Sequence, residues 1–300
     1  MHVPAEVAAR WSLDAARLVR VGSGRNSMHW RGETPSGATL ALRRHPREST
    51  RADAENELRV LELLHAHGIP VPEPVPADDG AFVVDDEGTW SACVWIDGRP
   101  PDRDDAEVAA GLGRVLAEVH AIPESAGGGP SAALAQYADA VRWGGYTLRS
   151  AVEKLRASEP AASTAVAECV SAVARHLDAV RPPPRRSLVH GDVHPLNVLV
   201  GDRGIAVLDW AFARWDDPLV DLAIAFRLWP EAFPSLLAAY REVRPVTEGE
   251  ASSIPVFAAA RGLDHLADRL TRWATGMDVD IAAELEAELP DLRRRLPALG

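Results

Sequence analysis

The first hundred residues alternate between short apolar segments and turns. Met28–Glu33 and Ala38–Arg44 have the spacing of two strands, and the turn Thr34-Pro35-Ser36-Gly37 lies between them. Ala81–Val84 and Trp90–Ile96 are two further strand candidates. This part of the chain is therefore predicted to form a small sheet.

Helical spacing of apolar residues dominates the remainder. Residues 51–67 place leucines on one face, which predicts one helix within the sheet-forming part. Residues 104–121 predict an amphipathic helix, and 131–180 are rich in alanine and helical in pattern until a run of three prolines. From about residue 218 the pattern is helical again.

These patterns predict an α+β protein of two lobes. We expect a small β-rich lobe over residues 1–97 and a larger, mainly helical lobe over residues 98–300. Within the larger lobe, residues from about 131 to 182 form a helical insertion.

Composition narrows the function classes. The chain has 300 residues, 47% apolar and 25% charged, and a net charge of −12. These are globular values, and the acidic balance argues against nucleic acid or an anionic membrane as the partner. A cationic ligand and simple solubility explain the charge equally well.

The few cysteines and the single lysine argue against a disulfide framework and against a lysine-containing phosphate loop. Cys93 and Cys169 cannot form a disulfide framework, and we expect no signal peptide and no membrane span, hence a cytoplasmic protein. Lys154 is the single lysine and lies in a helical pattern, so a phosphate loop of the GxxxxGK type is absent.

The segment that carries chemistry runs from Leu188 to Asn197 and contains His190-Gly191-Asp192. Leu208-Asp209-Trp210 follows, and then Asp217–Ala223. Phosphoryl transfer needs Mg²⁺ on the phosphates and a carboxylate that orients the acceptor hydroxyl. Mg²⁺ prefers oxygen ligands. An aspartate, an asparagine five residues later and a second aspartate beyond a short hairpin supply these groups.

This pattern resembles the aminoglycoside phosphotransferases, which belong with choline, homoserine and related small-molecule kinases in the protein-kinase-like fold. The resemblance covers most of the chain and is weakest across residues 125–185 and after 240. It implies a bilobal fold, with nucleotide bound by the amino-terminal lobe, ATP or GTP as phosphate donor, and Mg²⁺ as cofactor.

The resemblance also implies roles for individual residues. Asp192 would be the catalytic base, and Asn197 and Asp209 the Mg²⁺ ligands. His190 would brace the loop, and Asp221 would accept hydrogen bonds from its backbone.

A zinc site is not expected at the two histidines of this segment. His190 and His194 are four residues apart, but Gly191 and Pro195 break the helix that a metalloprotease pair requires. We interpret His194 as a packing residue.

The amino-terminal lobe would hold the nucleotide. A glycine-rich turn precedes a strand rather than a helix, which excludes a dinucleotide-binding crossover and suits a loop folded over phosphates. The candidate residues of this turn are Gly22, Ser23, Gly24, Asn26 and Ser27.

An arginine stands where the related kinases have lysine. Arg43 falls at the position on the third strand that faces the α- and β-phosphates, with Arg44 as the alternative. Its carboxylate partner is predicted to be Glu57, with Glu55 as the alternative. Arginine keeps the charge but has a different geometry, which bears on nucleotide affinity and on the choice between ATP and GTP.

Adenine would pair with backbone atoms, the Val94 carbonyl and the Ile96 N–H. Trp143 is a candidate for substrate stacking, although helix packing is the simpler interpretation. Asp264 and Asp268 could contact a cationic acceptor, although a solvated helix face explains them as well.

The predicted function is Mg²⁺-dependent transfer of a phosphoryl group to a hydroxyl of a small molecule, such as an aminoglycoside antibiotic. The alternative is a biosynthetic or metabolic kinase for a sugar, nucleoside, amino alcohol or peptide side chain. A pseudokinase would have lost Asp192, Asn197 or Asp209, and all three are present. A eukaryotic-type protein kinase is disfavoured because Trp210-Ala211 replaces Phe-Gly and no Ala-Pro-Glu segment follows.

Overall fold

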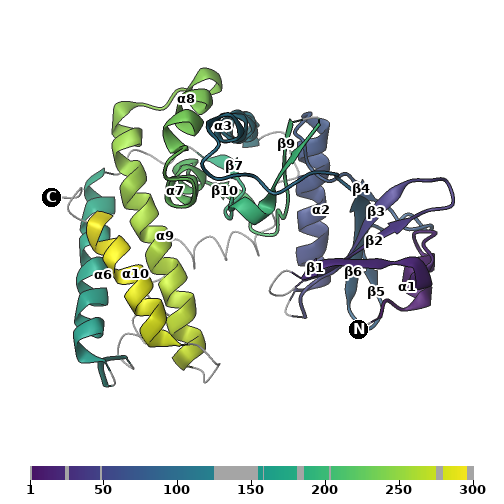
Figure 1. Cartoon of the computed structure of the whole chain (residues 1–300), viewed down its shortest axis with the longest axis horizontal. Coiled ribbons are helices and arrows are strands. Elements are labelled where there is room, and N and C mark those ends of the chain that lie inside the picture. Colours follow the sequence, from purple (N-terminus) through teal and green to yellow (C-terminus); the bar gives the residue numbers. More distant parts are fainter. Residues whose placement is uncertain are drawn as a thin grey trace.

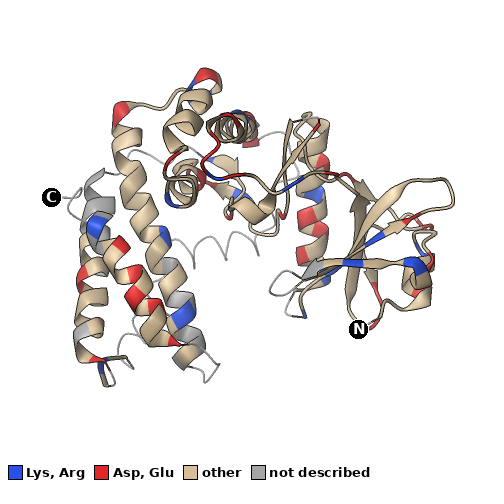
Figure 2. Ribbon diagram, in the orientation of Figure 1, with Lys and Arg blue, Asp and Glu red and all other residues tan. Residues whose placement is uncertain are grey.

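The computed structural model describes residues 2–23, 27–47, 49–124, 155–157, 159–180, 186–202, 204–274 and 280–295. A sheet with the helix α2 forms one side of the molecule, and a group of helices forms the other (Figure 1). Acidic residues recur along α2 and α10 (Figure 2), in keeping with the negative net charge.

An antiparallel sheet makes up most of the first side. Its strands are β1 (Val19–Ser23), β2 (Met28–Glu33), β3 (Thr39–Arg44), β4 (Pro74–Val75), β5 (Val84–Asp85) and β6 (Thr89–Val94). Their order is β1-β2-β3-β6-β4, and β5 also pairs with β6. The register sets Arg43 of β3 opposite His29 of β2 and Ser91 of β6. A short helix α1 (Ala5–Ala9) and a 3-10 turn η1 (Ala15–Arg17) precede the sheet.

The helix α2 (Arg51–Ala66) begins at a capping box. The Thr50 hydroxyl accepts from the Asp53 N–H, and the Asp53 carboxylate accepts from the Thr50 N–H at 2.8 Å. Leu58, Leu61 and Leu64 are buried on one face, as their spacing predicts. The helix thereby presents a fixed face to the sheet.

Helices and two short strand pairs form the second side. The helices are α3 (Ala106–Ala121), α6 (Pro160–Val180), α7 (Leu219–Leu228), α8 (Phe233–Val243), α9 (Glu248–Ala274) and α10 (Ile281–Arg295). The pairs are β7 (Ser187–Val189) with β10 (Arg214–Asp216), and β8 (Val198–Gly201) with β9 (Gly204–Val207); a 3-10 turn η3 (Pro195–Asn197) precedes β8.

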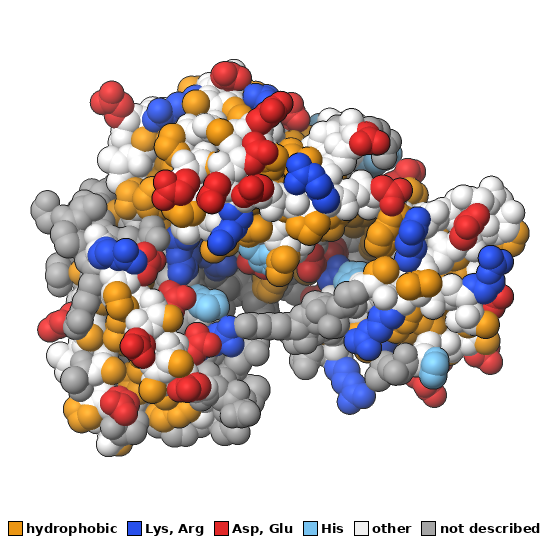
Figure 3. Space-filling model, viewed as in Figure 1, with side chains coloured by type: hydrophobic (Ala, Val, Ile, Leu, Met, Phe, Trp, Pro, Cys, Tyr) orange, Lys and Arg blue, Asp and Glu red, His pale blue; other side chains and the backbone are white. Residues whose placement is uncertain are grey.

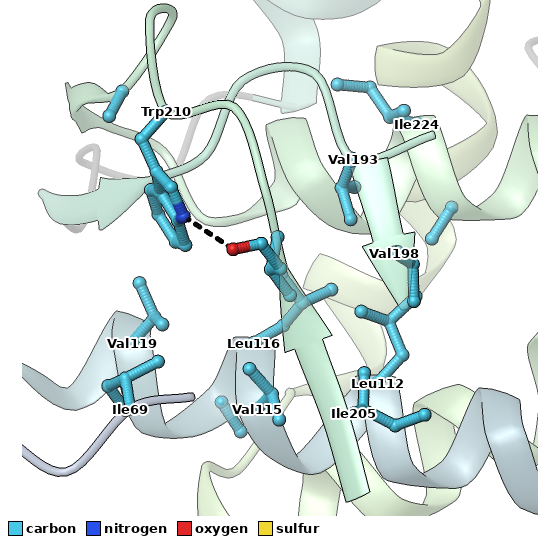
Figure 4. Packing of buried hydrophobic residues seen from close by; sticks show 14 of the residues in the cluster. Ile69, Leu112, Val115, Leu116, Val119, Val193, Val198, Ile205, Trp210 and Ile224 are labelled. Carbon is cyan, nitrogen blue, oxygen red and sulfur yellow. Dashed lines mark hydrogen bonds between the residues drawn. The ribbon is translucent and has the colours of Figure 1, made fainter. Parts of the chain in front are cut away.

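The core beneath the functional loops is apolar. Leu112, Leu116 and Val119 of α3 lie against Ile205 of β9 and against Trp210 in the loop beyond it (Figure 4). The Trp210 indole N–H donates to the Val207 carbonyl at 3.0 Å, so the loop after β9 is tied to the strand. This packing fixes both segments that carry the predicted aspartates.

Several expected elements differ in extent. The strand expected at Ala81–Val84 is only Val84–Asp85, and the one expected at Trp90–Ile96 ends at Val94. The sequence patterns did not predict β1, β4 or β10. β4 and β10 have only two and three residues, and β4 includes a proline. Within the insertion expected at 131–182, α6 is described. No helix of the described ranges combines the length and hydropathy that a membrane crossing needs.

Candidate active site

The segment from His190 to Asn197, here called the HGD loop, leaves the strand pair β7–β10 and enters β8. Gly191 has a φ of 81°, in the left-handed region that glycine tolerates. A Cβ there would lie 2.7 Å from the Phe212 carbonyl oxygen. Glycine at position 191 is therefore required for the loop to pack against the segment after Asp209.

His190 is buried and holds the loop from within. Its Nε2 bonds the Leu208 carbonyl at 2.8 Å, and its Nδ1 accepts from the Asp192 N–H at 3.1 Å. These partners require the Nε2–H tautomer. His190 thus connects the backbone of Asp192 to the residue just before Asp209.

Asp221 of α7 anchors the same loop from below. Its carboxylate accepts from the His190 N–H at 2.7 Å and from the Gly191 N–H at 2.8 Å. It also meets the Nε2 of His120 at 3.1 Å, and His120 Nδ1 lies 2.8 Å from the Tyr240 hydroxyl. Burial alone would raise the pKa of Asp221, but the His120 contact brings that pKa below its ordinary value. An ionised carboxylate therefore orders the loop backbone.

Asp192 presents its carboxylate at the surface of the site. Its side chain is 35% exposed, and one oxygen lies 3.6 Å from His194 Nε2. His194 also caps the 3-10 turn η3, because its Nδ1 accepts from the Leu196 N–H at 3.1 Å. The Asn197 Nδ2 donates to the Asp192 carbonyl at 3.0 Å, so the amide oxygen of Asn197 is the atom that could bind a cation.

Asp209 follows β9, next to Leu208, whose carbonyl is bonded by His190 of the HGD loop. Its φ of 71° is unusual for a residue with a side chain. Although burial would raise the pKa of Asp209, the Arg43 guanidinium outweighs this effect and lowers it. The carboxylate is thus held ionised, with a side chain 39% exposed.

Arg43 joins the sheet, α2 and the segment after β9. Its Nη1 lies 2.6 Å from Glu57 Oε1 and its Nη2 lies 3.2 Å from Asp209 Oδ1. Burial opposes ionisation, but the two carboxylates raise the pKa of Arg43 above its ordinary value. The Arg43 Nε is buried and has no hydrogen-bond partner among the described residues. An unpartnered donor at this position suits an anionic ligand.

Arg44 and Glu55, the alternatives to Arg43 and Glu57, have their side chains directed away from the candidate site. Arg44 lies with its guanidinium 5.5 Å from the Trp90 ring and donates to the Glu87 carbonyl, on the other face of β3. Glu55 pairs with Arg51 on the exposed side of α2. Neither reaches Asp209.

Two histidines lie beside Arg43 and were not predicted from the sequence. His29 lies directly opposite Arg43 on β2, and burial lowers its pKa to about 4. His45 follows two residues after Arg43; its Nε2 meets Ser91 Oγ at 2.8 Å, and burial lowers its pKa to about 3. The register of the hairpin around the turn at residues 34–37 could have found His29.

The nucleotide-side predictions are only partly described. Gly24 and Asn26 lie outside the described residues; Gly22 and Ser23 form the end of β1, where only the backbone is described. Ser27 is buried, with its Oγ 3.0 Å from His29 Nε2.

The predicted adenine contacts and acceptor residues are also only partly described. The Val94 N–H already donates to the Glu73 carbonyl at 2.8 Å, so the adenine prediction at Val94 concerns only its carbonyl oxygen. Trp143 lies outside the described residues, as do the side chains of Asp264 and Asp268.

One residue near the HGD loop was missed entirely. Arg261 of α9 is half-buried, and its Nη2 donates to the Gly191 carbonyl at 3.2 Å. It lies seventy residues away in sequence, in a helix with no motif. Only the packing of α9 beside the loop brings it there.

Known proteins share this architecture. The homoserine kinase of Methylocella silvestris is 30% identical over 228 residues, which span 72% of this chain and 68% of that protein. The amicoumacin kinase hAmiN, solved with AMP-PNP and Ca²⁺, superposes with a TM-score of 0.72 at 15% identity, over 98% of this chain and 92% of that one. The macrolide 2'-phosphotransferase MphH of Brachybacterium faecium gives a TM-score of 0.64 at 25% identity, over 96% of each chain.

A family comparison covers most of the sequence. Residues 17–252 match the family described as the phosphotransferase enzyme family. The α+β, protein-kinase-like fold class and the prediction of an enzyme that phosphorylates small molecules are thereby confirmed. From its HGD loop, its architecture and this match, the chain belongs to the phosphotransferase enzyme family.

Proposed function

We propose that this enzyme transfers the γ-phosphate of ATP to a hydroxyl of a small metabolic amino alcohol or hydroxy amino acid. The observation that carries the proposal is the guanidinium of Arg43, which contacts Glu57 and Asp209 at once and keeps a buried Nε without a partner among the described residues. A cation so held, beside an exposed carboxylate, suits the phosphates of a nucleotide.

Asp192 would act on the acceptor hydroxyl. Its exposed carboxylate orients the acceptor hydroxyl and takes the hydroxyl proton as the oxygen attacks the γ-phosphorus. The bond from that phosphorus to the β–γ bridging oxygen breaks, and its electron pair stays on ADP. His190 and Asp221 fix the backbone that carries this carboxylate.

Asn197 and Asp209 would hold Mg²⁺. The donor chemistry fits, because the Asn197 amide nitrogen is committed to the Asp192 carbonyl while its oxygen is not, and Arg43 keeps Asp209 ionised. Among the described residues, no group of three His, Cys, Asp or Glu side chains could cage a metal ion. Such a sparse ligand set suits Mg²⁺, which would neutralise charge on the phosphates when bound.

The sheet side holds the rest of the nucleotide. The backbone N–H groups of Ser23 to Ser27 are expected to bind phosphate oxygens, a prediction that falls mostly outside the described residues, and Arg43 would bind the non-transferring phosphates. The Val94 carbonyl and the Ile96 N–H pair with adenine. The complex of hAmiN with AMP-PNP and Ca²⁺ supports a nucleotide and a divalent ion in this fold. GTP as donor and a cytoplasmic location stay predictions.

The acceptor class rests on the relatives. The homoserine kinase of Methylocella silvestris phosphorylates, by its name, a hydroxy amino acid, and it is 30% identical to this chain. An antibiotic acceptor is the second candidate, supported by the 25% identity to a macrolide 2'-phosphotransferase over 96% of each chain.

A transfer assay separates these candidates. The enzyme is incubated with Mg²⁺ and either ATP or GTP, together with homoserine, amino alcohols, choline, nucleosides, an aminoglycoside and a macrolide, and products are read by mass spectrometry. We expect a phosphorylated amino alcohol or hydroxy amino acid. A phosphorylated antibiotic alone would replace the first candidate by the second, and nucleotide binding without any product would contradict both.

A further inference from the structure

The side chains of Ser27 and His29 lie close to Arg43, and the proposed mechanism does not use them. His29 is directly opposite Arg43 in the antiparallel pair of β2 with β3. Residues opposite each other in such a pair share one face of the sheet, with Cβ atoms about 5 Å apart. The His29 imidazole therefore lies on the face from which Arg43 reaches Asp209.

Ser27 and His29 are hydrogen-bonded to each other. The Ser27 Oγ lies 3.0 Å from the His29 Nε2. Burial, followed by the Arg43 guanidinium, lowers the pKa of His29 to about 4, so the ring is neutral at pH 7 and carries a single N–H. The pair thus owns two polar hydrogens, the ring N–H and the serine O–H, and uses one of them between its own members.

One donor is left over in either tautomer of the ring. If the His29 Nε2–H donates to Ser27, the serine O–H is spare. If Ser27 donates to Nε2, the ring carries its hydrogen on Nδ1, and that N–H is spare. Among the described residues no acceptor takes up this hydrogen. A polar group in such a place needs a partner, which is then water or a ligand.

The surroundings of this spare donor suit an anion. The Arg43 Nε is a further donor that is buried and has no partner among the described residues. His29 is only partly buried, so a molecule from solvent can reach it. Figure 3 shows a hollow between the sheet side and the helical side, with histidine and acidic side chains at its edge. Donors gathered beside one guanidinium match the oxygens of a phosphate.

A second pair of the same composition differs in its exposure. The His45 Nε2 lies 2.8 Å from the Ser91 Oγ. Both residues are buried, with 6% and 3% exposed. This pair is closed to solvent and serves the packing of the sheet, whereas Ser27 and His29 lie where a ligand can arrive.

We propose that the pair of Ser27 and His29 donates its spare hydrogen bond to a non-transferring phosphate of the nucleotide, beside Arg43. The inference rests on the proposed function and adds two side chains to the nucleotide site. The phosphate concerned stays on ADP after transfer. Binding of ADP and of ATP should therefore depend on the pair, and binding of adenosine should not.

The test measures binding of MgADP and MgATP by calorimetry, and of adenosine by displacement of MgADP. The variants are Ser27→Ala, His29→Leu and the double variant. The larger of the two single losses in MgADP and MgATP affinity should be about 10- to 100-fold, the range for one hydrogen bond to a charged group. The double variant should lose at most about twofold more, because the pair supplies one hydrogen bond. Adenosine affinity should stay within about twofold of wild type in all three variants.

Other results would overturn the inference in distinct ways. Unchanged MgADP and MgATP affinity in the variants would remove the pair from the nucleotide site and leave the proposed phosphotransfer standing. An equal loss for adenosine would show that the pair only shapes the sheet. A wild-type protein that binds neither MgADP nor MgATP would overturn both the inference and the proposed function. Ser27→Ala keeps the test decisive if His29→Leu fails to fold. His65→Leu, at a half-exposed histidine of α2, is the matched control and should bind all three ligands as wild type does.

Discussion

At the scale of single residues, the site depends on a guanidinium where related kinases have an ammonium group. Arg43 is buried, with 14% of its side chain exposed, and two of its nitrogens meet carboxylates from α2 and from the segment after β9. A planar fork can join two carboxylates in this way, whereas lysine is a point charge. The replacement thus ties the two predicted halves of the site together.

Removal of Arg43 should destabilise the protein through the charge that it leaves behind. Glu57 has only 6% of its side chain exposed, so Arg43→Met would bury an unpaired carboxylate and lower the free energy of unfolding by about 3–5 kcal/mol. The double variant with Glu57→Leu should recover most of this loss. Urea unfolding at pH 7 checks both, and a double variant no more stable than Arg43→Met would contradict the explanation.

The buried histidine near Arg43 should make stability depend on pH. Burial lowers the pKa of His45 to about 3, against about 6.5 in an unfolded chain. Between these values the unfolded state binds a proton that the folded state does not, so stability falls as the pH falls below about 6.5.

His45→Gln tests this directly by urea unfolding at pH 7 and pH 5.5. We expect the wild type to lose about 1 kcal/mol more than the variant over this interval, because glutamine does not titrate. Equal losses in the two proteins would show that His45 is not the group responsible.

Some residues of the candidate site could be predicted from the sequence, and others could not. The resemblance to the small-molecule kinases pointed to Arg43 and Glu57, and the structure brings the two within 2.6 Å. Their roles toward a nucleotide stay predictions. His29 needed the strand register, which depends on the exact turn between β2 and β3. Arg261 lies in a helix without a motif, and only tertiary packing brings it to Gly191.

At the scale of elements, the helices α3 and α8 pack closely against each other and together position Asp221, which binds the backbone of the HGD loop. Both helices contribute to the network that holds Asp221, through His120 and Tyr240. The crossing requires Gly113, since a Cβ there would lie 3.0 Å from the Leu236 carbonyl carbon of α8. The short strands β4 and β10 escaped prediction because two or three residues give no measurable alternation.

Gly113→Ala should therefore destabilise the protein despite the better helix propensity of alanine. We expect a loss of about 1–3 kcal/mol in the free energy of unfolding, because the added methyl meets backbone that cannot turn aside. Gly249→Ala in α9, where nothing lies within 4 Å, is the control and should be neutral or stabilising. Equal thermal unfolding midpoints for the two variants would contradict the role of this crossing.

At the scale of the whole molecule, the candidate site is assembled from distant parts of the chain. Arg43 and Glu57 come from the sheet side, and Asp192, Asn197 and Asp209 from loops on the helical side. The resemblance supplied this grouping, since neither periodicity nor composition relates positions so far apart. The division of the chain at residue 97 stays a prediction.

The net charge of the chain and that of a side chain beside the HGD loop differ in sign. A net charge of −12 is compatible with a cationic acceptor. The described side chains beside the HGD loop nevertheless include Arg261, whose Nη2 donates to the Gly191 carbonyl at 3.2 Å. The net charge of the chain therefore does not establish the sign of the charge beside the HGD loop.

The central claim is that Asp192 acts on the acceptor while Arg43, Asn197 and Asp209 hold the nucleotide. The most direct measurement compares Asp192→Asn with wild type for kcat and for the MgATP dissociation constant by calorimetry, with Asp202→Asn in the β8–β9 turn as control. We predict a fall in kcat of about 10²- to 10⁴-fold with MgATP affinity unchanged, and a control that behaves as wild type. Wild-type turnover by Asp192→Asn, or loss of MgATP binding in place of turnover, would contradict the account.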